Sequence, residues 1–286
     1  ARAWLDQGAP KPFVLTELGP GRGTLMADVL RATADIPGFT DAAQVVLVET
    51  SPELRVQQRD RLGDDVIWVD KMDAVPDGPT FLVANEFFDA LPIRQFVRDA
   101  QGWRERMVTV IDDELSFALA QPAQFAHLEH RLQDTDIGQI VETCPSASPI
   151  MSQIGQRIVQ SGGAALIIEY GAVRSLGDTL QALRKHEYTE VLDHPGEADL
   201  TAHVDFAALA EATAARCYGP VTQGVWLERL GITARARVLA RTLEGHAYQS
   251  HLAAHRRLTH PEEMGTLFKT LGLSPFDAPP LPGFMQ

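Results

Sequence analysis

The chain has 286 residues, of which 45% are hydrophobic and 22% charged, as is ordinary for a globular protein with a sizeable core. The formal net charge of -13, without a basic run of five or more residues, makes nucleic acid a poor candidate partner, and we expect none. No apolar run approaches the ~18 residues that span a bilayer, so we expect no membrane span. Two cysteines cannot form a disulfide framework, which favours a reducing compartment.

The first part of the chain alternates short apolar segments with helical patterns. Residues 1–7 are typical of the end of a helix, and residues 24–34 have helical apolar spacing. Ser51 followed by Pro52 is typical of a helix start. Continuous apolar runs predict buried strands at 13–17, 45–49, 66–69 and 80–84. This alternation predicts an α/β fold, with a mostly parallel sheet and helices on both faces.

The pattern changes after Leu91. Residues 93–119 alternate between apolar and polar, with turn signals at "DAQG" and "DDE", which predicts an antiparallel meander. Further elements are predicted as a helix at 147–160, a buried strand at 162–171, a helix at 206–215, a strand end at 219–222 and a largely helical stretch at 225–247.

We therefore expect residues 1–286 to form a single interrupted domain. It would carry a β-rich insertion at about 95–160 and a helical region at about 225–270. The chain begins "ARAWLDQGAPKP", without an initiator Met, so we expect a native N-terminal segment to be absent from it.

A glycine-rich turn follows the first predicted strand. Glu17 ends the strand, and Gly19, Gly21 and Gly23 give G-x-G-x-G. Glycines at a helix N-terminus let a ligand lie directly against unpaired N–H groups. The spacing differs from the G-x-G-x-x-G of dinucleotide sites, which disfavours an NAD-dependent dehydrogenase, and the lysine of a Walker A loop is missing. An acid just before G-x-G-x-G is typical of a site for S-adenosylmethionine (SAM), whose cationic amino-acid end faces the acid.

Polar residues also end the next three strands. Glu49 follows the second strand, where a carboxylate can accept hydrogen bonds from two ribose hydroxyls; a helix-entry acid is the alternative interpretation. Asp70 follows the third strand, where an acid can meet the adenine amino group beside Trp68, although a plain loop acid is equally compatible. Asn85 ends the fourth strand and offers a donor and an acceptor to a cofactor or substrate.

The fourth strand leads into "ANEFFDALP", in which two acids enclose two aromatic residues. Glu86 and Asp89 would lie at the carboxyl edge of the sheet, where ligands bind in open α/β folds, and can pair with a cationic substrate. Glu169, at the end of a later strand, is a third acid at this edge. The alternative for Asp89 is helix capping.

Six segments carry a family resemblance. They are "ELGPGRGTLMADVLRA", "NEFFDALPIRQF", "GDTLQA", "DLTAHVDF", "GPVTQG" and "MGTLFK". In this order, between about Trp4 and Phe284, they resemble the MidA-like SAM-dependent methyltransferases. The resemblance implies a class I methyltransferase fold, which is Rossmann-like, with SAM as cofactor. We expect no metal site. Mitochondrial members of that family are assembly factors for respiratory complex I and methylate an arginine of one of its subunits.

The resemblance implies protein arginine methylation here, with a subunit like that of complex I as partner. Glu86, Asp89 and Glu169 would then orient the guanidinium of the acceptor, although Glu169 stands where the family usually has aspartate. A non-catalytic SAM-binding assembly chaperone and a small-molecule methyltransferase are the alternatives. We expect a bacterial cytoplasm, or the mitochondrial matrix if the source is eukaryotic, and the oligomeric state stays open.

Overall fold

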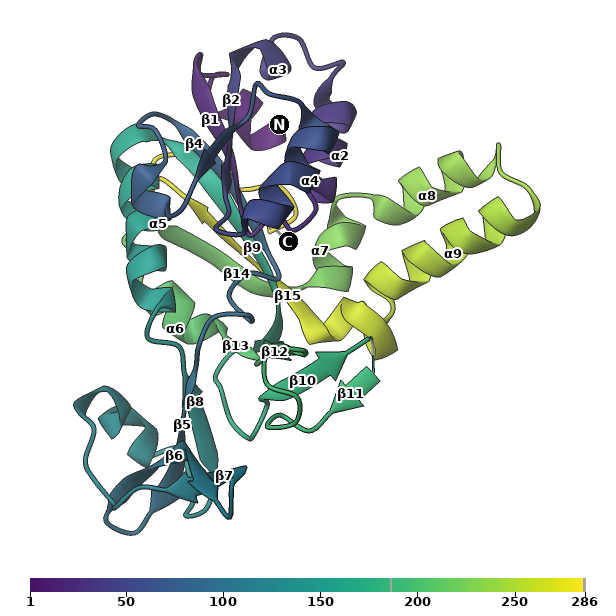
Figure 1. The fold of residues 1–286 in the computed structure, drawn as a ribbon. Coiled ribbons are helices and arrows are strands. Elements are labelled where there is room, and N and C mark those ends of the chain that lie inside the picture. Colours follow the sequence, from purple (N-terminus) through teal and green to yellow (C-terminus); the bar gives the residue numbers. More distant parts are fainter. Residues whose placement is uncertain (186, 285–286) are drawn as a thin grey trace.

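The computed structural model describes residues 1–185 and 187–284. Its centre is a sheet with the strand order β3-β2-β1-β4-β9-β15-β14 (Figure 1). The parallel strands are β1 (Phe13–Leu18), β2 (Ala43–Val48), β3 (Ile67–Val69), β4 (Thr80–Asn85) and β9 (Gly163–Ala172). Two antiparallel strands, β15 (Phe268–Ser274) and β14 (Arg216–Thr222), complete one edge, and β13 (Val204–Asp205) pairs parallel with the last residues of β9.

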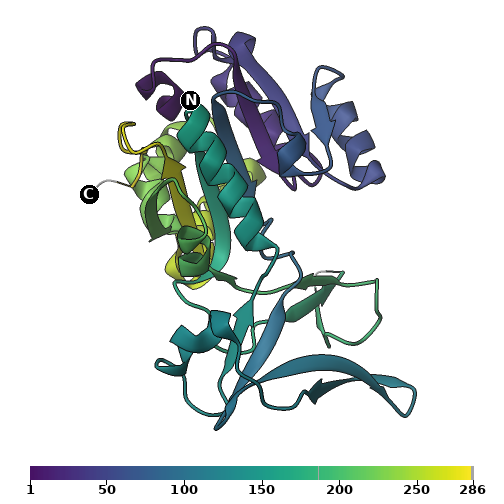
Figure 2. The same cartoon turned by 90° about the vertical axis from the view of Figure 1, so that its left-hand side faces the viewer.

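Helices cover both faces of this sheet, as Figures 1 and 2 show. On one face lie α5 (Ala147–Ser161), α6 (Phe206–Glu211) and the turn η1 (Met72–Ala74). On the other face lie α1 (Arg2–Asp6), α2 (Thr24–Thr33) and α3 (Phe39–Ala42), with α4 (Pro52–Leu62) beside α2. The predicted α/β class, with helices on both faces of a mostly parallel sheet, is confirmed.

Alternate residues of each strand enter different cores. Val14 packs into the cluster under α5, whereas Phe13 and Leu15 pack with Trp4 and Met26 on the opposite face. Successive side chains of a strand point to opposite faces, so a strand covered on both sides is apolar at most of its positions. The four predicted apolar runs are therefore strands β1 to β4, within two residues at each end.

The meander predicted after Leu91 is also confirmed. It forms an antiparallel sheet of order β7-β6-β5-β8, seen at the lower left of Figure 1. Its elements are β5 (Arg94–Asp99), β6 (Gly102–Ile111), β7 (Glu114–Leu119), the 3-10 helix η2 (Ala126–Leu132) and β8 (Ile140–Thr143). The last part of the range 95–160 is α5, whose Met151, Ile154 and Ile158 are buried in the main core. The part that stands outside the core therefore ends near Thr143.

Several elements differ from the sequence prediction. The helix predicted at 206–215 ends at Glu211, because the Thr213 hydroxyl accepts a hydrogen bond from the N–H of Ala215 and stabilises a turn instead. Residues 268–270, placed in the helical region, belong to strand β15. A small antiparallel sheet of β10 (Gln181–Arg184), β11 (Glu187–Thr189) and β12 (Asp199–Thr201) was not predicted.

The helical region itself projects from the sheet, to the right in Figure 1. It contains α7 (Gln223–Arg229), α8 (Ile232–Ala240), α9 (Gly245–Thr259) and the short turn η3 (Pro261–Gly265). Neither α8 nor α9 has a buried residue. Within residues 1–185 and 187–284, no helix combines the length and apolarity needed to cross a membrane.

Candidate active site

The glycine loop lies at the carboxyl edge of the sheet, after β1. All three glycines have left-handed backbone, with φ of 60° at Gly19, 52° at Gly21 and 72° at Gly23. A side chain with a Cβ is strained in this region, so glycine is the residue that fits. A Cβ on Gly23 would lie 3.3 Å from Gln58 and from Leu62, so this third glycine allows α4 to pack closely. A Cβ on Gly21 would meet no protein atom within 4 Å in the part of the chain that is described.

Glu17 is buried beside this loop, in β1 between β2 and β4. Its residue exposure is 4%, and its Oε2 has no hydrogen-bond partner among the described residues. Burial raises the pKa of Glu17 to about 7, and a backbone N–H of Met26 partly offsets this rise. A buried carboxylate with an unused oxygen suits a cationic partner. Together with the open space at Gly21, it fits the ammonium end of SAM.

Glu49 follows β2, and its carboxylate is held at both oxygens. Oε1 accepts a hydrogen bond from the N–H of Ser51 at 2.8 Å, and Oε2 accepts one from Nε2 of Gln58 at 3.3 Å. Nε of Arg55 donates to the main-chain oxygen of Glu49 at 2.9 Å. Because a carboxylate oxygen has two lone pairs, each oxygen keeps one for a ribose hydroxyl. The structure is also compatible with the alternative interpretation of Glu49 as a helix-entry acid, because Ser51, which donates to its Oε1, lies at the start of α4.

The positions of Asp70 and Asn85 support contact with a cofactor less strongly than those of Glu17 and Glu49. The Asp70 side chain is 78% exposed and forms an ion pair with Nη2 of Arg55 at 2.7 Å. Asn85 is half-buried at the end of β4, and its Nδ2 donates to Oε1 of Glu86 at 3.3 Å. Both residues lie at the predicted edge of the sheet, and their contact with a cofactor stays a prediction.

The three predicted catalytic acids meet where β4 and β9 end. Glu169 is fully buried, and its Oε1 accepts hydrogen bonds from the N–H groups of Phe87 at 2.8 Å and Phe88 at 2.7 Å. Asp89 is 5% exposed, whereas Glu86 is exposed and has a left-handed φ of 51°. Such backbone strain in a residue other than glycine is often found at functional sites.

Burial and the neighbouring carboxyl groups raise the pKa values of two of these acids. Burial raises the pKa of Glu169 well above its ordinary value, and the neighbouring Asp89 and Glu86 raise it further. Burial also raises the pKa of Asp89, opposed by a hydrogen bond from Tyr170 and assisted by Glu86. Oδ1 of Asp89 and Oε2 of Glu169 are buried without a hydrogen-bond partner among the residues described. Two such oxygens can accept hydrogen bonds from a cation that enters the site.

Sequence reasoning missed two residues that support the acids and the loop. The Tyr170 hydroxyl lies beside Asp89 and beside Thr201 and Gln181 of the small sheet, and its ring packs edge-on against His203 with centroids 5.4 Å apart. Gln58 links the glycine loop to Glu49. Tyr170 follows Glu169 directly and was open to inspection, but nothing local distinguishes Gln58 in the polar run "RVQQRDRL".

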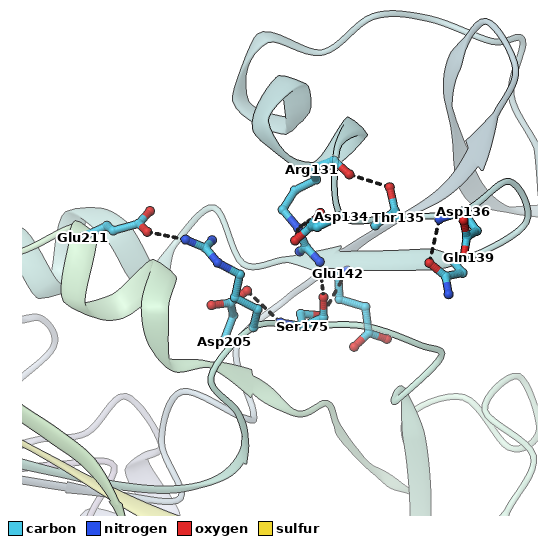
Figure 3. Close-up of polar contacts among 10 residues, drawn as sticks. Arg131, Asp134, Thr135, Asp136, Gln139, Glu142, Ser175, Asp205 and Glu211 are labelled. Carbon is cyan, nitrogen blue, oxygen red and sulfur yellow. Dashed lines mark hydrogen bonds and ion pairs between the residues drawn. The ribbon is translucent and has the colours of Figure 1, made fainter.

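A cavity of about 780 Å³ lies beside the turn after β4, between the β5–β8 sheet and the helices α5 and α6. Phe88 and His203 are among its lining residues. Figure 3 shows how its walls are joined: Nη2 of Arg131 donates to the Ser175 carbonyl oxygen at 2.9 Å, and the N–H of Ser175 donates to Oδ2 of Asp205 at 2.8 Å. The main-chain N–H of Glu142 donates to the Ser175 hydroxyl at 3.2 Å. These bonds fix the inserted sheet against the core.

Comparisons with known proteins agree with this geometry. Residues 1–221 match the sequence model of a family described as "Putative S-adenosyl-L-methionine-dependent methyltransferase". The chain is 36% identical over 321 residues to the mitochondrial protein arginine methyltransferase NDUFAF7 of Xenopus laevis, with 98% of this chain and 73% of the relative covered. It is 34% identical over 303 residues to the Homo sapiens protein of that name, with 95% and 68% covered.

A solved structure has the same fold. It is a protein from Burkholderia thailandensis bound to S-adenosyl-homocysteine (SAH), which is 29% identical and superposes with a TM-score of 0.82 over 100% of this chain and 76% of its own. The chain therefore belongs to this family of S-adenosyl-L-methionine-dependent methyltransferases, and S-adenosyl-L-methionine is its cofactor.

Proposed function

We propose that the chain methylates an arginine of a protein substrate. The observation that carries this proposal is the pair of buried acids, Asp89 and Glu169, each with an oxygen that no described residue occupies. A guanidinium presents several N–H donors in one plane, and it pairs with carboxylates in this way. The names of the curated relatives, which are protein arginine methyltransferases, support the same acceptor.

In this proposal the cofactor is held by the glycine loop and two acids. The carboxylate of Glu17 would bind the ammonium group, the backbone around Gly19 and Gly21 would leave room for the nucleoside, and Glu49 would accept hydrogen bonds from the ribose. Asp70 and Asn85 complete the site at the ends of β3 and β4. When bound, SAM supplies a methyl group on a positively charged sulfur, which is already activated for transfer.

The acids near the ends of β4 and β9 act on the acceptor. Glu86, Asp89 and Glu169 bind the guanidinium and concentrate its positive charge away from the nitrogen that is methylated. That nitrogen must release a proton. A carboxylate whose pKa is raised by burial and by like charges is a suitable group to take it, because it binds a proton more readily than an ordinary acid.

The kind of substrate is a narrower proposal, which rests on the family resemblance of the sequence segments. We infer that the acceptor arginine belongs to a protein like the complex I subunit that mitochondrial members methylate, and that methylation serves assembly of the respiratory complex. We place this activity in the bacterial cytoplasm, or in the mitochondrial matrix of a eukaryotic source.

The experiment that tests the proposal identifies the methylated atom. The chain is incubated with SAM carrying a labelled methyl group and with arginine-bearing peptides, each paired with a control in which lysine replaces arginine. The products are hydrolysed and separated, and label is expected in methylarginine from the arginine peptides alone. Label in another amino acid or in a small molecule would contradict arginine as the acceptor, as would a complete absence of transfer by a chain that binds SAH.

A further inference from the structure

Gln58 is the buried residue of an otherwise polar helix. Within α4, all of which the structure describes, Gln58 alone is buried, and its exposure is 0%. A glutamine removed from water must satisfy both ends of its amide or lose the free energy of those hydrogen bonds. Its partners therefore indicate why a polar side chain occupies this position.

The orientation of the amide is fixed by Trp68. Nε1 of Trp68 lies 2.8 Å from Oε1 of Gln58, and an indole N–H can only donate. The carbonyl end of the amide must therefore face Trp68, and the NH₂ end must face the opposite way. On that side it donates to the main-chain oxygen of Gly21 at 2.6 Å and to Oε2 of Glu49 at 3.3 Å.

One amide thus joins two parts of the cofactor site. Gly21 belongs to the loop after β1, and Glu49 follows β2. The bond to the Gly21 carbonyl fixes the orientation of the peptide after Gly21, a residue with left-handed backbone and no side chain to restrict its conformation. A bond to Oε2 of Glu49 acts together with the Ser51 N–H on Oε1, so that the plane of the carboxylate is held from both ends. Gly23 leaves the room that the Gln58 side chain needs, since a Cβ there would lie 3.3 Å from its Cγ.

We propose that Gln58 is a positioning residue for SAM, which acts through Glu49 and the Gly21 carbonyl, with Trp68 setting the direction of its amide. The inference rests on the proposed contact between Glu49 and the ribose, and it is independent of the identity of the methyl acceptor. Preorganised carboxylates and loops bind more tightly than free ones because less freedom is lost on binding.

The test is calorimetric titration with SAH, which needs no acceptor. Gln58→Glu keeps the size and shape of the side chain and its acceptor for Trp68, but it places a second carboxylate against Glu49. At pH 8 this variant is expected to bind SAH at least about ten-fold more weakly than the wild type. Toward pH 6 the introduced carboxyl takes up a proton and can donate again, so the ratio of the two Kd values is expected to shrink. Gln57→Glu, the same change at the exposed neighbouring position of α4, is expected to leave the Kd unchanged.

A double-mutant cycle separates positioning from general damage. Gln58→Leu is expected to weaken SAH binding by about ten-fold in the wild-type background, independently of pH, and by less than about three-fold when Glu49→Gln is already present. Equal losses in both backgrounds would overturn the action of Gln58 through Glu49, and an unchanged Kd in a folded Gln58→Glu variant would overturn its positioning role as a whole. If Glu49→Gln alone leaves SAH binding unchanged, the proposed contact between Glu49 and the ribose is wrong. The same series of variants therefore distinguishes a failure of the ribose contact from a failure of the role of Gln58.

Discussion

Gly19 and Phe87 fit against each other so closely that a single added carbon would not be accommodated. A Cβ on Gly19 would lie 2.9 Å from Cδ2 of Phe87, below the contact distance that real side chains show. The cofactor loop after β1 and the acid-bearing turn after β4 are therefore in direct contact. The ring of Phe87 packs in turn on Phe88 with centroids 5.2 Å apart, and the N–H groups of both bond to Glu169. Movement of the loop would thus disturb the turn that carries the proposed acceptor site.

This contact predicts different effects at two glycines with similar backbone. Gly19→Ala and Gly21→Ala both introduce left-handed alanine, at a cost of about 1–2 kcal/mol each. Only Gly19→Ala also meets Phe87, so it should lower the free energy of unfolding more, as measured by urea denaturation without cofactor. Adding Phe87→Leu should recover part of the additional loss. Equal destabilisation by the two single changes would show that the loop and the turn are not in close contact.

The raised pKa of Glu17 predicts cofactor binding that depends on pH. Its pKa is about 7 in the free protein, and a bound ammonium group would lower it, because the opposite charge favours the carboxylate. The affinity for SAH should therefore rise by roughly ten-fold between pH 6 and pH 8, with release of a proton on binding. Calorimetry in buffers of different ionisation enthalpy measures both quantities. The Glu17→Gln variant should bind weakly with a flat pH profile, and a wild-type profile that is equally flat would contradict the role of Glu17.

The same pKa predicts that Glu17 lowers the stability of the free protein. Burial raises the pKa of Glu17 from 4.5 to about 7 in the folded chain, so folding favours the protonated carboxyl. The resulting contribution to the free energy of unfolding is fully present below pH 4.5 and is lost as pH rises through about 7. The loss amounts to about 3 kcal/mol at pH 8. Glu17→Gln should consequently unfold at higher urea than the wild type at pH 8, and at nearly the same urea at pH 4.5. A variant less stable than the wild type at pH 8 would indicate that the carboxylate already has a favourable partner.

The acids after β4 should affect turnover without affecting the cofactor. Glu86→Gln and Asp89→Asn each remove one charge while preserving shape, and each is expected to lower the rate of methyl transfer by at least about 100-fold with the Kd for SAH unchanged. Asp41→Asn, at an exposed position in α3, is the matched control. An unchanged rate in either variant would remove that residue from acceptor binding.

The contacts of Arg131 predict that this residue contributes to the attachment of the inserted sheet to the core. Its side chain is 4% exposed, and Arg131→Met would leave the Ser175 carbonyl without its donor and the Asp134 carboxylate without its partner. We expect a loss of about 2–4 kcal/mol in the free energy of unfolding. Arg31→Met breaks an exposed pair with Asp28, whose side chains are 75% and 59% exposed, and should cost less than about 1 kcal/mol. Similar losses in both variants would show that the junction in Figure 3 contributes little.

The cofactor loop and the strands around it were predictable because their signals are local. Glu17, the three glycines and Glu49 each follow an apolar run, and strand ends determine where such residues lie. Gln58 was not predictable, since its role depends on how α4 packs against β1 and β2. Strand β15 was missed for a similar reason. The segment "FKTLGLS" is short and interrupted by Lys269 and Gly272, and it pairs with β9, whose residues lie 98 to 108 positions earlier in the chain. Sequence also gave no indication that Asp89 is buried and Glu86 exposed.

The most direct test of the cofactor site is calorimetric titration with SAH of the wild-type chain and of Glu49→Ala. The wild type should bind one SAH per chain, and Glu49→Ala, folded as judged by circular dichroism, should show no measurable binding, because the ribose loses its two acceptors. Wild-type binding that survives unchanged in Glu49→Ala would contradict the placement of the cofactor at the ends of β1 and β2.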